Sequence, residues 1–417
     1  MKEYKYDLVI IGGGPAGMSA AVEAAEQDIQ KILIIERDSQ LGGILQQCIH
    51  DGFGIHRFGQ RLSGCEYAQR YIDLLAEKNV DVALNTMVLE LTEKKELYTV
   101  NSKEGMMHIT AKAVILAMGC RERTASQVSI CGSRPAGVLT AGSVQRYINV
   151  EGYIPGKRAV ILGSGDIGLI MARRMTLEGI RVLGVFEAAP APGGLTRNIV
   201  QCLEDYHIPL TLSHTVTQVH GKQRIEGVTV SEVGPGFEPV SGTERYIPCD
   251  LLVLAVGLIP ENELSKGAGV RLDPKTKGPV VDNCMMTSVP GIFAAGNVSV
   301  VFDLVDFVSE TGVIAARGAA GYIRGELSDH PEYIDVLAKE NINFLIPQRI
   351  RKDAAEKSRI FLRVRKPMKK NELICMGNGK IIGKKRAIHA APSEMMTISV
   401  TPGAVDEVDV MVREVQL

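Results

Sequence analysis

Residues 6–36 have the sequence YDLVIIGGGPAGMSAAVEAAEQDIQKILIIE. A short apolar run at residues 8–11 leads directly into residues 12–17, which fit the pattern G-x-G-x-x-G. An alanine-rich segment with helical spacing follows, and a second apolar run at residues 32–35 ends in Glu36. The order strand, glycine-rich turn, helix, strand and acid predicts a βαβ unit.

The glycines and the acid have separate physical roles in such a unit. Gly12 permits a tight turn, Gly14 lets the backbone approach a pyrophosphate, and Gly17 lets the helix pack closely on the strand. The helix N-terminus offers unpaired N–H groups and the positive end of its dipole to the phosphates. Glu36 lies 19 residues after Gly17, where an acid accepts hydrogen bonds from a ribose. Residues 12–36 are therefore predicted to bind a dinucleotide.

The bulk composition is that of a soluble globular protein. With 417 residues, 45% of them apolar and 23% charged, the chain is expected to form two or three domains. A net charge of −1 gives no general attraction to nucleic acid or to anionic membranes. No window approaches the roughly 18 apolar residues of a spanning helix, and the N-terminal apolar run opens into glycines rather than a cleavage site. We therefore expect a cytoplasmic protein with no transmembrane segment and no nucleic-acid partner.

The eight cysteines are scattered along the chain, and none forms a C-x-x-C motif. This argues against a redox dithiol, a zinc knuckle or an iron–sulfur cluster held by this chain alone. Most of the cysteines are therefore expected to be small buried apolar side chains, and no metal site is predicted.

The segment after Glu36 predicts the rest of a first unit. Residues 41–59 are rich in Gly, His and Gln, which is typical of a loop with one helical turn. Periodicity then predicts a helix, a strand, an antiparallel meander and a buried strand leading into Ala-x-Gly. These elements span residues 66–78, 80–84, 87–91, 97–100, 107–109 and 113–117.

The same order of elements returns later in the chain. Residues 158–162 (RAVIL) lead into a second G-x-G-x-x-G at residues 163–168, and a helix follows. Glu187 lies 19 residues after Gly168, the same offset as in the first motif. The next strand, a second meander and a final buried strand span residues 182–186, 214–230 and 250–255. The chain is therefore predicted to carry two dinucleotide-binding units of one plan.

Two units favour two different cofactors. An acid at Glu187 repels a ribose 2′-phosphate and can bind the free 2′-hydroxyl, so NAD(H) is favoured over NADP(H) at the second unit. Arg181 and Arg197 are near enough in sequence to keep NADP(H) as the alternative.

With these motifs the chain resembles the FAD/NAD(P)-binding superfamily of pyridine nucleotide-disulfide oxidoreductases. The resemblance implies that the first motif binds FAD and the second binds NAD(P). Residues 117–119 and 255–257 are similar to the Ala-x-Gly stretches at which the chain crosses between the two domains. Residues 287–297 (TSVPGIFAAGN) are similar to the second FAD motif, T-x-x-P-G-h-h-A-x-G-D. Asn297 stands in place of the final acid, which contacts the flavin ribityl or pyrophosphate region, and it keeps the ability to bond a hydroxyl.

The resemblance implies an α/β fold with two Rossmann-like three-layer domains, each with a β-meander. Residues 1–121 and 258–345 are expected to form a discontinuous FAD-binding domain. Residues 122–257 are expected to form the NAD(P)-binding domain, and residues 346–417 a small β-rich C-terminal module. The residues expected to contact the cofactors are Gly12, Gly14, Pro15, Ala16, Gly17, Glu36, Arg37, Gly42, Gly43, Ala117, Gly119, Gly163, Gly165, Asp166, Ile167, Gly168, Glu187, Gly257, Gly296 and Asn297.

The cysteine pair that names the superfamily is missing, so disulfide reductase activity is not expected. Cys48 is the one cysteine shortly after the Leu-Gly-Gly stretch, and it is either a sulfenic acid or thiolate site or a buried inert residue. The resemblance places His50 and His56 beside the isoalloxazine ring. Either histidine could manage the N1 or N5 proton, or merely hydrogen-bond the loop backbone.

Two further pairs of charged residues have open roles. Arg121 and Arg123 could neutralise cofactor phosphate or reduced-flavin charge, or be ordinary surface arginines. Asp303 and Asp306 follow the second FAD motif at a spacing that suits one helix face, where they could serve partner docking or flavin-site polarity.

Three segments show a closer resemblance to the smaller FAD/NAD subunits of multi-subunit dehydrogenases: LGGILQQCIHDGFG, CGSRPAGVLTAG and GNVSVVFDLVDFVSE. Such relatives act on sarcosine, opines, hydroxyproline or hydrogen cyanide precursors, and one three-component type is assigned to glycerol 3-phosphate. The resemblance implies two partners, a small iron–sulfur protein and a flavoprotein dehydrogenase subunit, with any cluster supplied by a partner. A homo-oligomer is also compatible with it.

The C-terminal region differs in character from the rest. Residues 348–370 are crowded with Arg and Lys, and residues 359–365 (RIFLRVR) alternate apolar and basic positions, which predicts a half-buried strand. Asn378-Gly379 predicts a hairpin, and residues 396–400 a further strand. The basic face is either a solvated edge strand protected by charge or a docking surface for an acidic partner protein.

Three functions are compatible with this sequence. The first is an FAD-dependent, NAD(H)-linked oxidoreductase that passes a hydride between nicotinamide and flavin as the electron-transfer subunit of a dehydrogenase complex. Its substrate would be glycerol 3-phosphate or an amino or hydroxy acid. The second is a self-sufficient NADH oxidase or NADH:acceptor reductase, and the third is a non-catalytic cofactor-binding scaffold. The intact glycines and acids of both motifs argue against the scaffold.

Overall fold

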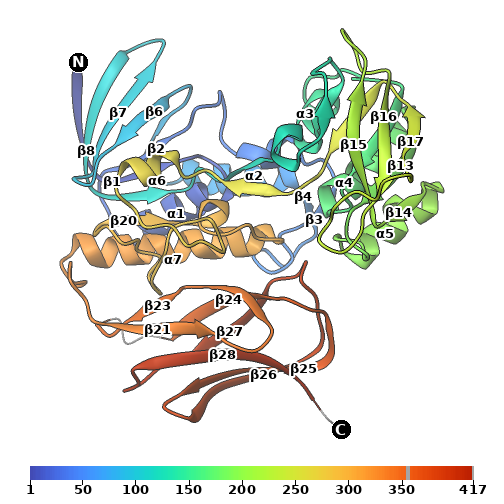
Figure 1. Cartoon of the computed structure of the whole chain (residues 1–417). Coiled ribbons are helices and arrows are strands. Elements are labelled where there is room, and N and C mark those ends of the chain that lie inside the picture. Colours follow the sequence, from blue (N-terminus) through green and yellow to red (C-terminus); the bar gives the residue numbers. More distant parts are fainter. Residues whose placement is uncertain (354–356, 416–417) are drawn as a thin grey trace. The chain divides into compact units, whose positions relative to one another are not determined.

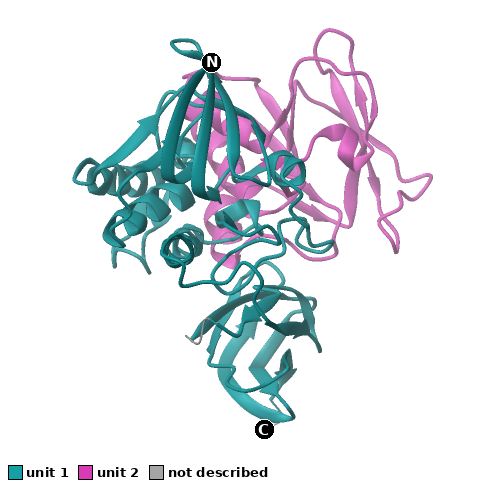
Figure 2. Cartoon of the chain, turned by 90° about the vertical axis from the view of Figure 1, so that its left-hand side faces the viewer, with its two compact units in different colours: residues 1–120, 260–417 teal, residues 121–259 magenta. Residues whose placement is uncertain are grey.

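The computed structural model describes residues 1–353 and 357–415, and the chain divides into two compact units. Unit 1 comprises Met1–Cys120 and Pro260–Leu417, and unit 2 comprises Arg121–Ile259 (Figure 2). Each unit contains a parallel sheet with helices, and unit 1 also contains a strand-rich C-terminal part. The predicted α/β class with two Rossmann-like domains is confirmed.

Unit 1 is organised around a five-strand parallel arrangement (Figure 1). Its strands lie in the order β5 (Val80–Ala83), β2 (Ile32–Ile35), β1 (Lys2–Ile11), β8 (Gly105–Leu116) and β20 (Ile292–Ala294). All four residues of β2 are buried, which is why its sequence is a continuous apolar run rather than an alternating one.

Helices α1 (Pro15–Glu26) and α7 (Val305–Ile323) pack against each other beside this sheet. A Cβ on Gly312 would lie 2.3 Å from the carbonyl oxygen of Ala16, so the two backbones approach too closely for any other residue. The hydroxyl of Ser19 donates to a carbonyl oxygen of α7 at 3.0 Å across the same contact. This packing holds the first half of α7 beside the start of α1.

Strand β8 is longer than the sequence predicts. Separate strands are predicted at residues 107–109 and 113–117, but Gly105–Leu116 is one continuous strand. Strand β1 pairs with nearly the whole length of β8, while β7 (Glu96–Asn101) pairs with the first half of β8. Backbone hydrogen bonds on both sides hold the polar middle extended, so strand pairing overrides the break in the apolar pattern.

The shorter elements of this part of unit 1 include the predicted helical turn and helix. The helix begins at Gly64 because Ser63 and Glu66 form a capping box: Ser63 Oγ accepts from Glu66 N at 3.3 Å, and Glu66 Oε2 accepts from Ser63 N at 2.7 Å. The bounds are η1 (Gly43–Gln47), β3 (Asp51–Phe53), β4 (Leu62–Ser63), α2 (Gly64–Ala76), β6 (Met87–Leu91), α6 (Glu263–Gly267) and η4 (Gly296–Val298). Two short strands lie where the chain passes between units, β9 (Cys120–Glu122) and β19 (Leu258–Pro260).

Unit 2 repeats the parallel arrangement and adds a second sheet. The parallel sheet has the order β11 (Val138–Thr140), β18 (Leu251–Leu254), β12 (Arg158–Leu162), β13 (Arg181–Glu187) and β14 (Leu210–Leu212). The second sheet has the order β10 (Cys131–Gly132), β15 (His214–His220), β16 (Gly227–Glu232) and β17 (Arg245–Pro248). The helices are η2 (Ala125–Val128), α3 (Ala141–Asn149), α4 (Asp166–Leu177), α5 (Thr196–Cys202) and η3 (Glu204–Tyr206).

The C-terminal part of unit 1, here called the C-terminal module, consists of the strands from Tyr333 onward. Five strands form one sheet in the order β23 (Arg349–Arg351), β21 (Tyr333–Ala338), β28 (Glu407–Glu414), β25 (Met368–Gly377) and β26 (Lys380–Ala390). Three form another in the order β22 (Ile342–Ile346), β24 (Ser358–Val364) and β27 (Met396–Val400). The predicted hairpin at Asn378-Gly379 is confirmed, with both residues at positive φ (+48° and +74°) as a type I′ turn requires.

The half-buried strand predicted at residues 359–365 is present as β24, but its burial and its place in the sheet differ from the prediction. Strand β24 is the central strand of its sheet and is buried on both faces, because Phe361 packs edge-on against Phe302 and Phe307 on the face that carries the arginines. Arg359 pairs with Glu310 of α7 at 3.1 Å. The basic face of this strand therefore contacts the same chain, and the strand is not a solvated edge.

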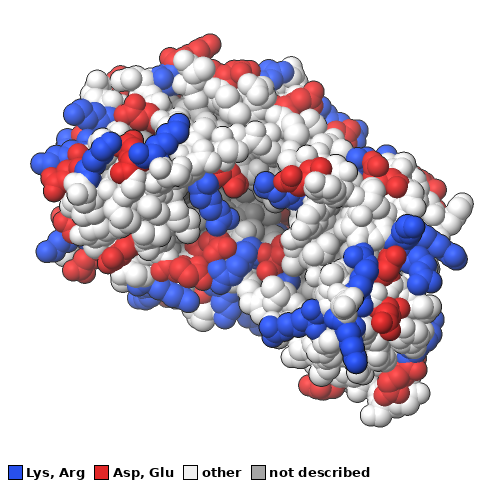
Figure 3. All heavy atoms as spheres, turned by 90° about the horizontal axis from the view of Figure 1, so that it is seen from above, with Lys and Arg blue, Asp and Glu red and all other residues white. Residues whose placement is uncertain are grey.

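The acids after the second FAD motif also bind groups of this chain. Asp303 pairs with Arg363 at 3.8 Å and accepts a hydrogen bond from Met395 N at 3.0 Å. Asp306 accepts one from Arg57 N at 2.8 Å. Elsewhere, on the face drawn in Figure 3, Lys and Arg side chains lie among Asp and Glu side chains.

A buried arginine joins the C-terminal module to the rest of unit 1. The side chains of Arg351 and Asp282 are both 0% exposed and lie 3.4 Å apart. Arg351 also donates to both carboxylate oxygens of Asp353, at 2.9 and 2.8 Å, and to the carbonyl oxygen of Ser328 at 2.8 Å. Every charge in this cluster has hydrogen-bonding partners, which is the condition under which a buried ion pair is tolerated.

Replacing Arg351 by Met should lower the free energy of unfolding of unit 1 by about 3 kcal/mol, because it leaves Asp282 buried without its cation. The shift of the urea midpoint of the full chain measures this effect. The matched control is Arg413→Met, which breaks an exposed pair with Glu340 and should cost less than about 1 kcal/mol. Equal losses in the two variants would contradict a structural role for the buried cluster.

The same cluster predicts a pH dependence of stability. Burial raises the pKa of Asp282 from 3.8 to about 6, and the opposing attraction of Arg351 is smaller. The folded chain therefore binds this proton more tightly than the unfolded chain, so the contribution of Asp282 is full below pH 3.8 and is lost as the pH rises through about 6. The difference in urea midpoint between wild type and Asp282→Asn should change across this window. If the difference in urea midpoint between the two proteins stays constant from pH 4 to pH 7, the raised pKa of Asp282 is refuted.

Candidate nucleotide-binding turns

Only one glycine of the first glycine-rich turn, Gly14, has room for a side chain. Gly12 has φ of +108°, and a Cβ there would lie 2.4 Å from the carbonyl oxygen of Ala117. A Cβ on Gly17 would lie 1.8 Å from the carbonyl oxygen of Gly12. Gly14 has nothing within 4 Å of its added Cβ. Gly12 and Gly17 are therefore required by the protein's own packing, whereas the open space at Gly14 is available to a ligand.

Glu36 is directed at this turn. Its side chain is buried, with 6% of its surface exposed. Oε2 accepts a hydrogen bond from Gly13 N at 2.7 Å, and Oε1 accepts one from Asp38 N at 2.8 Å. The sequence predicts only a ribose contact for this acid, but the acid also fixes the turn. A carboxylate has about four acceptor sites, so two remain for ribose hydroxyls.

The second turn has the same construction. Gly163 has φ of +101° and no space for a Cβ, which would meet the carbonyl oxygen of Ala255 at 2.2 Å. A Cβ on Gly168 would lie 2.5 Å from the carbonyl oxygen of Gly163. Gly165 has nothing within 4 Å. The two structural glycines and the one open glycine thus fall at the same motif positions in both units.

Glu187 repeats the arrangement of Glu36. Its Oε2 accepts from Ser164 N at 2.9 Å and from Ser164 Oγ at 2.7 Å, and its Oε1 accepts from Ala189 N at 2.9 Å. Ser164 Oγ accepts from Gly193 N at 2.8 Å in turn. Ser164 was not identified as a site residue from the sequence. A hydroxyl side chain between two motif glycines is the feature that could have indicated a hydrogen bond to the acid.

The helices that follow the turns have open N-termini. Gly14 is the N-cap of α1 and Gly165 that of α4, and neither makes a side-chain capping bond. Their first N–H groups are therefore available to an anion such as a pyrophosphate. The Oδ1 atom of Asp166 accepts hydrogen bonds from Leu195 N at 2.8 Å and from Asn198 Nδ2 at 2.6 Å. Its observed role is to hold residues 193–198 against the start of α4.

Two of the other predicted residues of unit 1, Gly42 and Gly43, lie against the first turn. Gly42 N donates to the carbonyl oxygen of Gly13 at 2.8 Å, and a Cβ on Gly43 would lie 3.2 Å from the Cα of Gly14. Gly119 has φ of +74° and open space around it. Arg37 is exposed beside Glu36.

Asn297 uses both ends of its amide within unit 1. Its Oδ1 accepts from Phe302 N at 3.0 Å, and its Nδ2 lies 3.5 Å from Cys120 Sγ. Gly296 N donates to Thr311 Oγ1 at 2.8 Å, which ties this turn to α7. Thr311 was also missed, because nothing local in the sequence distinguishes it from other helix residues.

Unit 2 holds the remaining predicted positions. Gly257 has φ of +101°, and its carbonyl oxygen accepts from Arg123 N at 3.0 Å. Arg121 is exposed at the start of the same unit.

The residues proposed for redox or proton chemistry have different surroundings. Cys48 is buried, which raises the pKa of its thiol to about 12, and its Sγ donates to the carbonyl oxygen of Ile44 at 3.3 Å. A thiol with such a pKa holds almost no thiolate at neutral pH, so the structure favours the inert interpretation. His50 lies against Phe53 with ring centroids 5.1 Å apart, while His56 is exposed and stacks on Phe307 at 6.3 Å.

The described residues were also compared with the requirements of a metal site and of a membrane-spanning helix. Within residues 1–353 and 357–415, no three His, Cys, Asp or Glu side chains are grouped so that they could hold a metal ion. None of the described helices is both long enough and apolar enough to cross a membrane.

The turns fit the phosphates and ribose of a dinucleotide, because each combines an open glycine, an uncapped helix N-terminus and an acid with spare acceptor sites. Comparison with known proteins agrees with this fit. Residues 6–319 match the family model described as pyridine nucleotide-disulphide oxidoreductase.

Two relatives and one solved structure illustrate the similarity. Hydrogen cyanide synthase subunit HcnB of Pseudomonas protegens is 29% identical over 281 residues, covering 63% of this chain and 58% of HcnB. An opine oxidase subunit of Agrobacterium tumefaciens is 27% identical over 313 residues, covering 70% of this chain and 61% of the relative. The crystal structure of thioredoxin reductase from T. acidophilum superposes with a TM-score of 0.61 at 26% identity, covering 76% of this chain and 98% of that one.

The chain thus spans about three fifths of the length of these two curated relatives. The family model covers well over half of the chain, and both glycine-rich turns lie within it. The protein belongs to the pyridine nucleotide-disulphide oxidoreductase family of FAD-dependent NAD(P)H oxidoreductases.

Proposed function

We propose that the protein passes a hydride between NAD(H) and FAD and serves as the electron-transfer subunit of a multi-subunit dehydrogenase. The observation that carries this proposal is the repeated turn. Gly13 and Ser164 donate their N–H groups to Glu36 and Glu187 in the same way, so one chain offers two dinucleotide sites of one construction.

We assign FAD to the first turn and the nicotinamide nucleotide to the second. Bound FAD would supply the hydride-accepting chemistry, which no amino acid side chain provides. The N-terminus of α1 would hold the pyrophosphate and Glu36 the ribose, while Asn297 offers an amide in place of a charged group at the second FAD motif. The protein's own contribution is thus binding and orientation.

The acid of the second turn supports NAD(H) over NADP(H). A carboxylate at Glu187 would repel a 2′-phosphate. Arg181 begins the strand that Glu187 ends, so about 20 Å of extended chain separates the two residues. This separation argues against Arg181 as a phosphate ligand. Of the two arginines considered for NADP(H), Arg197 is exposed in α5 next to Asn198.

The proposal that the chain works within a larger enzyme is supported by the relatives. HcnB and the opine oxidase relative are both named as subunits. We propose two partners in the cytoplasm, a small iron–sulfur protein and a flavoprotein dehydrogenase subunit, with glycerol 3-phosphate or an amino or hydroxy acid as the ultimate substrate. Self-association of the chain is compatible with this assembly.

Anaerobic stopped-flow mixing tests the cofactor assignment. The FAD-loaded chain should lose its flavin absorbance near ~450 nm at least about tenfold faster with NADH than with NADPH at equal concentration, because Glu187 disfavours the 2′-phosphate. Flavin that stays oxidised with both nucleotides would refute the second-site assignment.

A steady-state readout on the same sample tests whether the chain depends on partners. The isolated chain should reduce artificial dyes with NADH much faster than it reduces oxygen, and mild purification of the native complex should yield the two partners. Fast oxygen turnover by the isolated chain, with no partner retained, would favour the self-sufficient NADH oxidase instead.

The glycines offer a matched test of the second site. Gly165→Ala should change the free energy of unfolding by less than about 0.5 kcal/mol, because φ of −65° and ψ of 162° suit alanine and its Cβ meets nothing within 4 Å. NADH affinity should fall at least about tenfold, because the methyl group occupies the space into which the pyrophosphate fits. Urea unfolding and NADH titration measure the two effects.

The control for this variant is Gly163→Ala. Its φ of +101° and a Cβ contact at 2.2 Å should destabilise unit 2 by more than about 2 kcal/mol whether or not nucleotide is present. Unchanged NADH affinity in Gly165→Ala would show that the second turn does not hold the nucleotide.

A further inference from the structure

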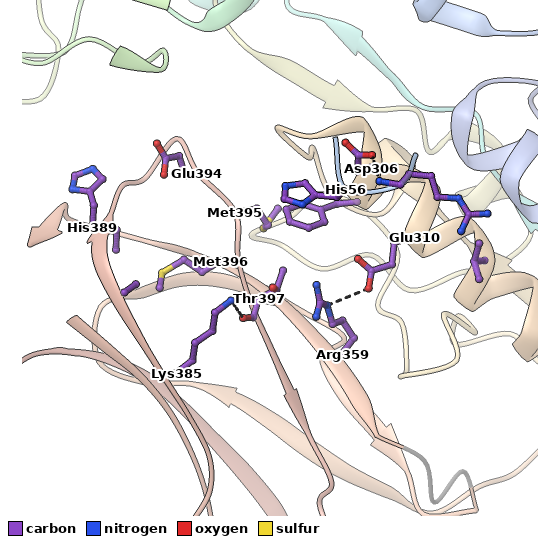
Figure 4. Close-up of a pocket in the computed structure, with 15 residues that line it drawn as sticks. His56, Asp306, Glu310, Arg359, Lys385, His389, Glu394, Met395, Met396 and Thr397 are labelled. Atoms are coloured by element: carbon purple, nitrogen blue, oxygen red, sulfur yellow. Dashed lines mark hydrogen bonds and ion pairs between the residues drawn. The ribbon is translucent and has the colours of Figure 1, made fainter. Parts of the chain in front are cut away.

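A cavity of about 620 Å³ lies within unit 1, between the start of α7 and the C-terminal module (Figure 4). Its size falls in the range of small-molecule sites. His56, Asp306 and Glu310 line one side, and Lys385, His389 and Met395 line the other. None of these residues belongs to the two nucleotide-binding turns.

Two of the acids in the cavity already bond to groups of this chain. Asp306 accepts a hydrogen bond from Arg57 N at 2.8 Å and lies in the first turn of α7, where the helix dipole favours a negative charge. Glu310 pairs with Arg359 at 3.1 Å. Glu394, half-buried at the rim, is the remaining acid of the lining.

Two cations in the cavity donate to uncharged oxygens instead. Lys385 Nζ donates to the backbone carbonyl oxygen of Thr397 at 3.0 Å, and Arg57 Nε donates to the Tyr71 hydroxyl at 3.0 Å. Neither forms an ion pair with a carboxylate among the described residues. The cavity lining as a whole carries three cations and three carboxylates and so has no net charge, but the ammonium group of Lys385 is a cation that no carboxylate of the described chain pairs with. The rings of His56 and His389 add further hydrogen-bond donors.

The cavity also offers an apolar surface beside these cations. The ring of Phe307 stacks on His56 with an interplanar angle of 9°, and Met395 and Met396 line the opposite wall. Flat rings and thioether side chains adapt to apolar or aromatic groups.

We propose that this cavity binds a small organic oxyanion, a carboxylate or a phosphate ester that carries an apolar body. The oxyanion contacts Lys385, and the apolar body packs on Phe307 and Met395. The site is separate from the FAD and NAD(H) turns, so it stands whether or not the proposed electron-transfer role is correct.

Probes of one shape and different charge test the proposal by calorimetric titration of the full, FAD-loaded chain. Benzoate or phenyl phosphate should bind saturably, and the tighter of the two identifies the oxyanion. Benzamide should bind at least about tenfold more weakly, since it lacks the charge that strengthens a hydrogen bond to Lys385. Benzylammonium should not bind. Equal binding of benzoate and benzamide, or no binding of either oxyanion, would overturn the proposal.

Neighbouring lysines on one strand provide the matched variants. Lys385→Gln should weaken binding of the preferred oxyanion about tenfold. Lys384→Gln should change it less than about twofold, because Lys384 pairs with Glu372 at 2.8 Å on the other face of β26. Equal losses in both variants would show a general effect of surface charge and refute the site.

A third variant tests whether a loss of oxyanion binding comes from the cavity itself rather than from a loss of folded structure. Ala387→Leu puts a larger side chain on the cavity wall and should abolish oxyanion binding while flavin content and urea midpoint stay as in the wild type. Retained binding in a folded Ala387→Leu protein would place the oxyanion elsewhere.

Discussion

Both units depend on a glycine whose missing Cβ lets two strands and a helix meet at one point. At Gly12 the added atom would meet the carbonyl oxygen of Ala117, and at Gly163 that of Ala255. The close approach lets the turn N–H groups reach an acid at the end of the neighbouring strand, Glu36 in one unit and Glu187 in the other. The acid that is predicted to bind the ribose therefore also holds the turn in place through a hydrogen bond. A substitution at either acid would alter the loop as well as any nucleotide it holds.

The sequence was most informative where structure follows from local pattern. The βαβ units, the Asn378-Gly379 hairpin and the strand at residues 158–162 depend on glycine conformations and short apolar runs, which neighbouring residues largely determine. Strand β8 differs because pairing with β1 and β7 keeps a polar segment extended, and no local pattern records a distant partner strand.

Side-chain environments were the least predictable part of the candidate site. The apparent alternation around Phe361 suggested one buried face, yet its ring fills the second face against Phe302 and Phe307, far away in sequence. Asp166 follows a motif glycine, so proximity in sequence suggested a cofactor contact, whereas the structure shows it holding Asn198. The sequence alone also could not tell whether Cys48 was buried or accessible, and burial determines its thiol chemistry.

In the C-terminal module, the partners of a cation depend on whether the cation is buried or exposed to water. Arg351 is fully buried and is matched by two carboxylates and a carbonyl oxygen, since a charge removed from water without partners would be strongly destabilising. Lys385 lies at an open cavity and needs no such match, because water solvates its ammonium group. A ligand that displaces this water meets a cation without a competing carboxylate, and in a partly desolvated site the attraction is several-fold stronger than in bulk water. The anchoring arginine and the cavity lysine thus follow one rule: the chain supplies counterions where water is excluded and leaves a charge unmatched where a ligand can reach it.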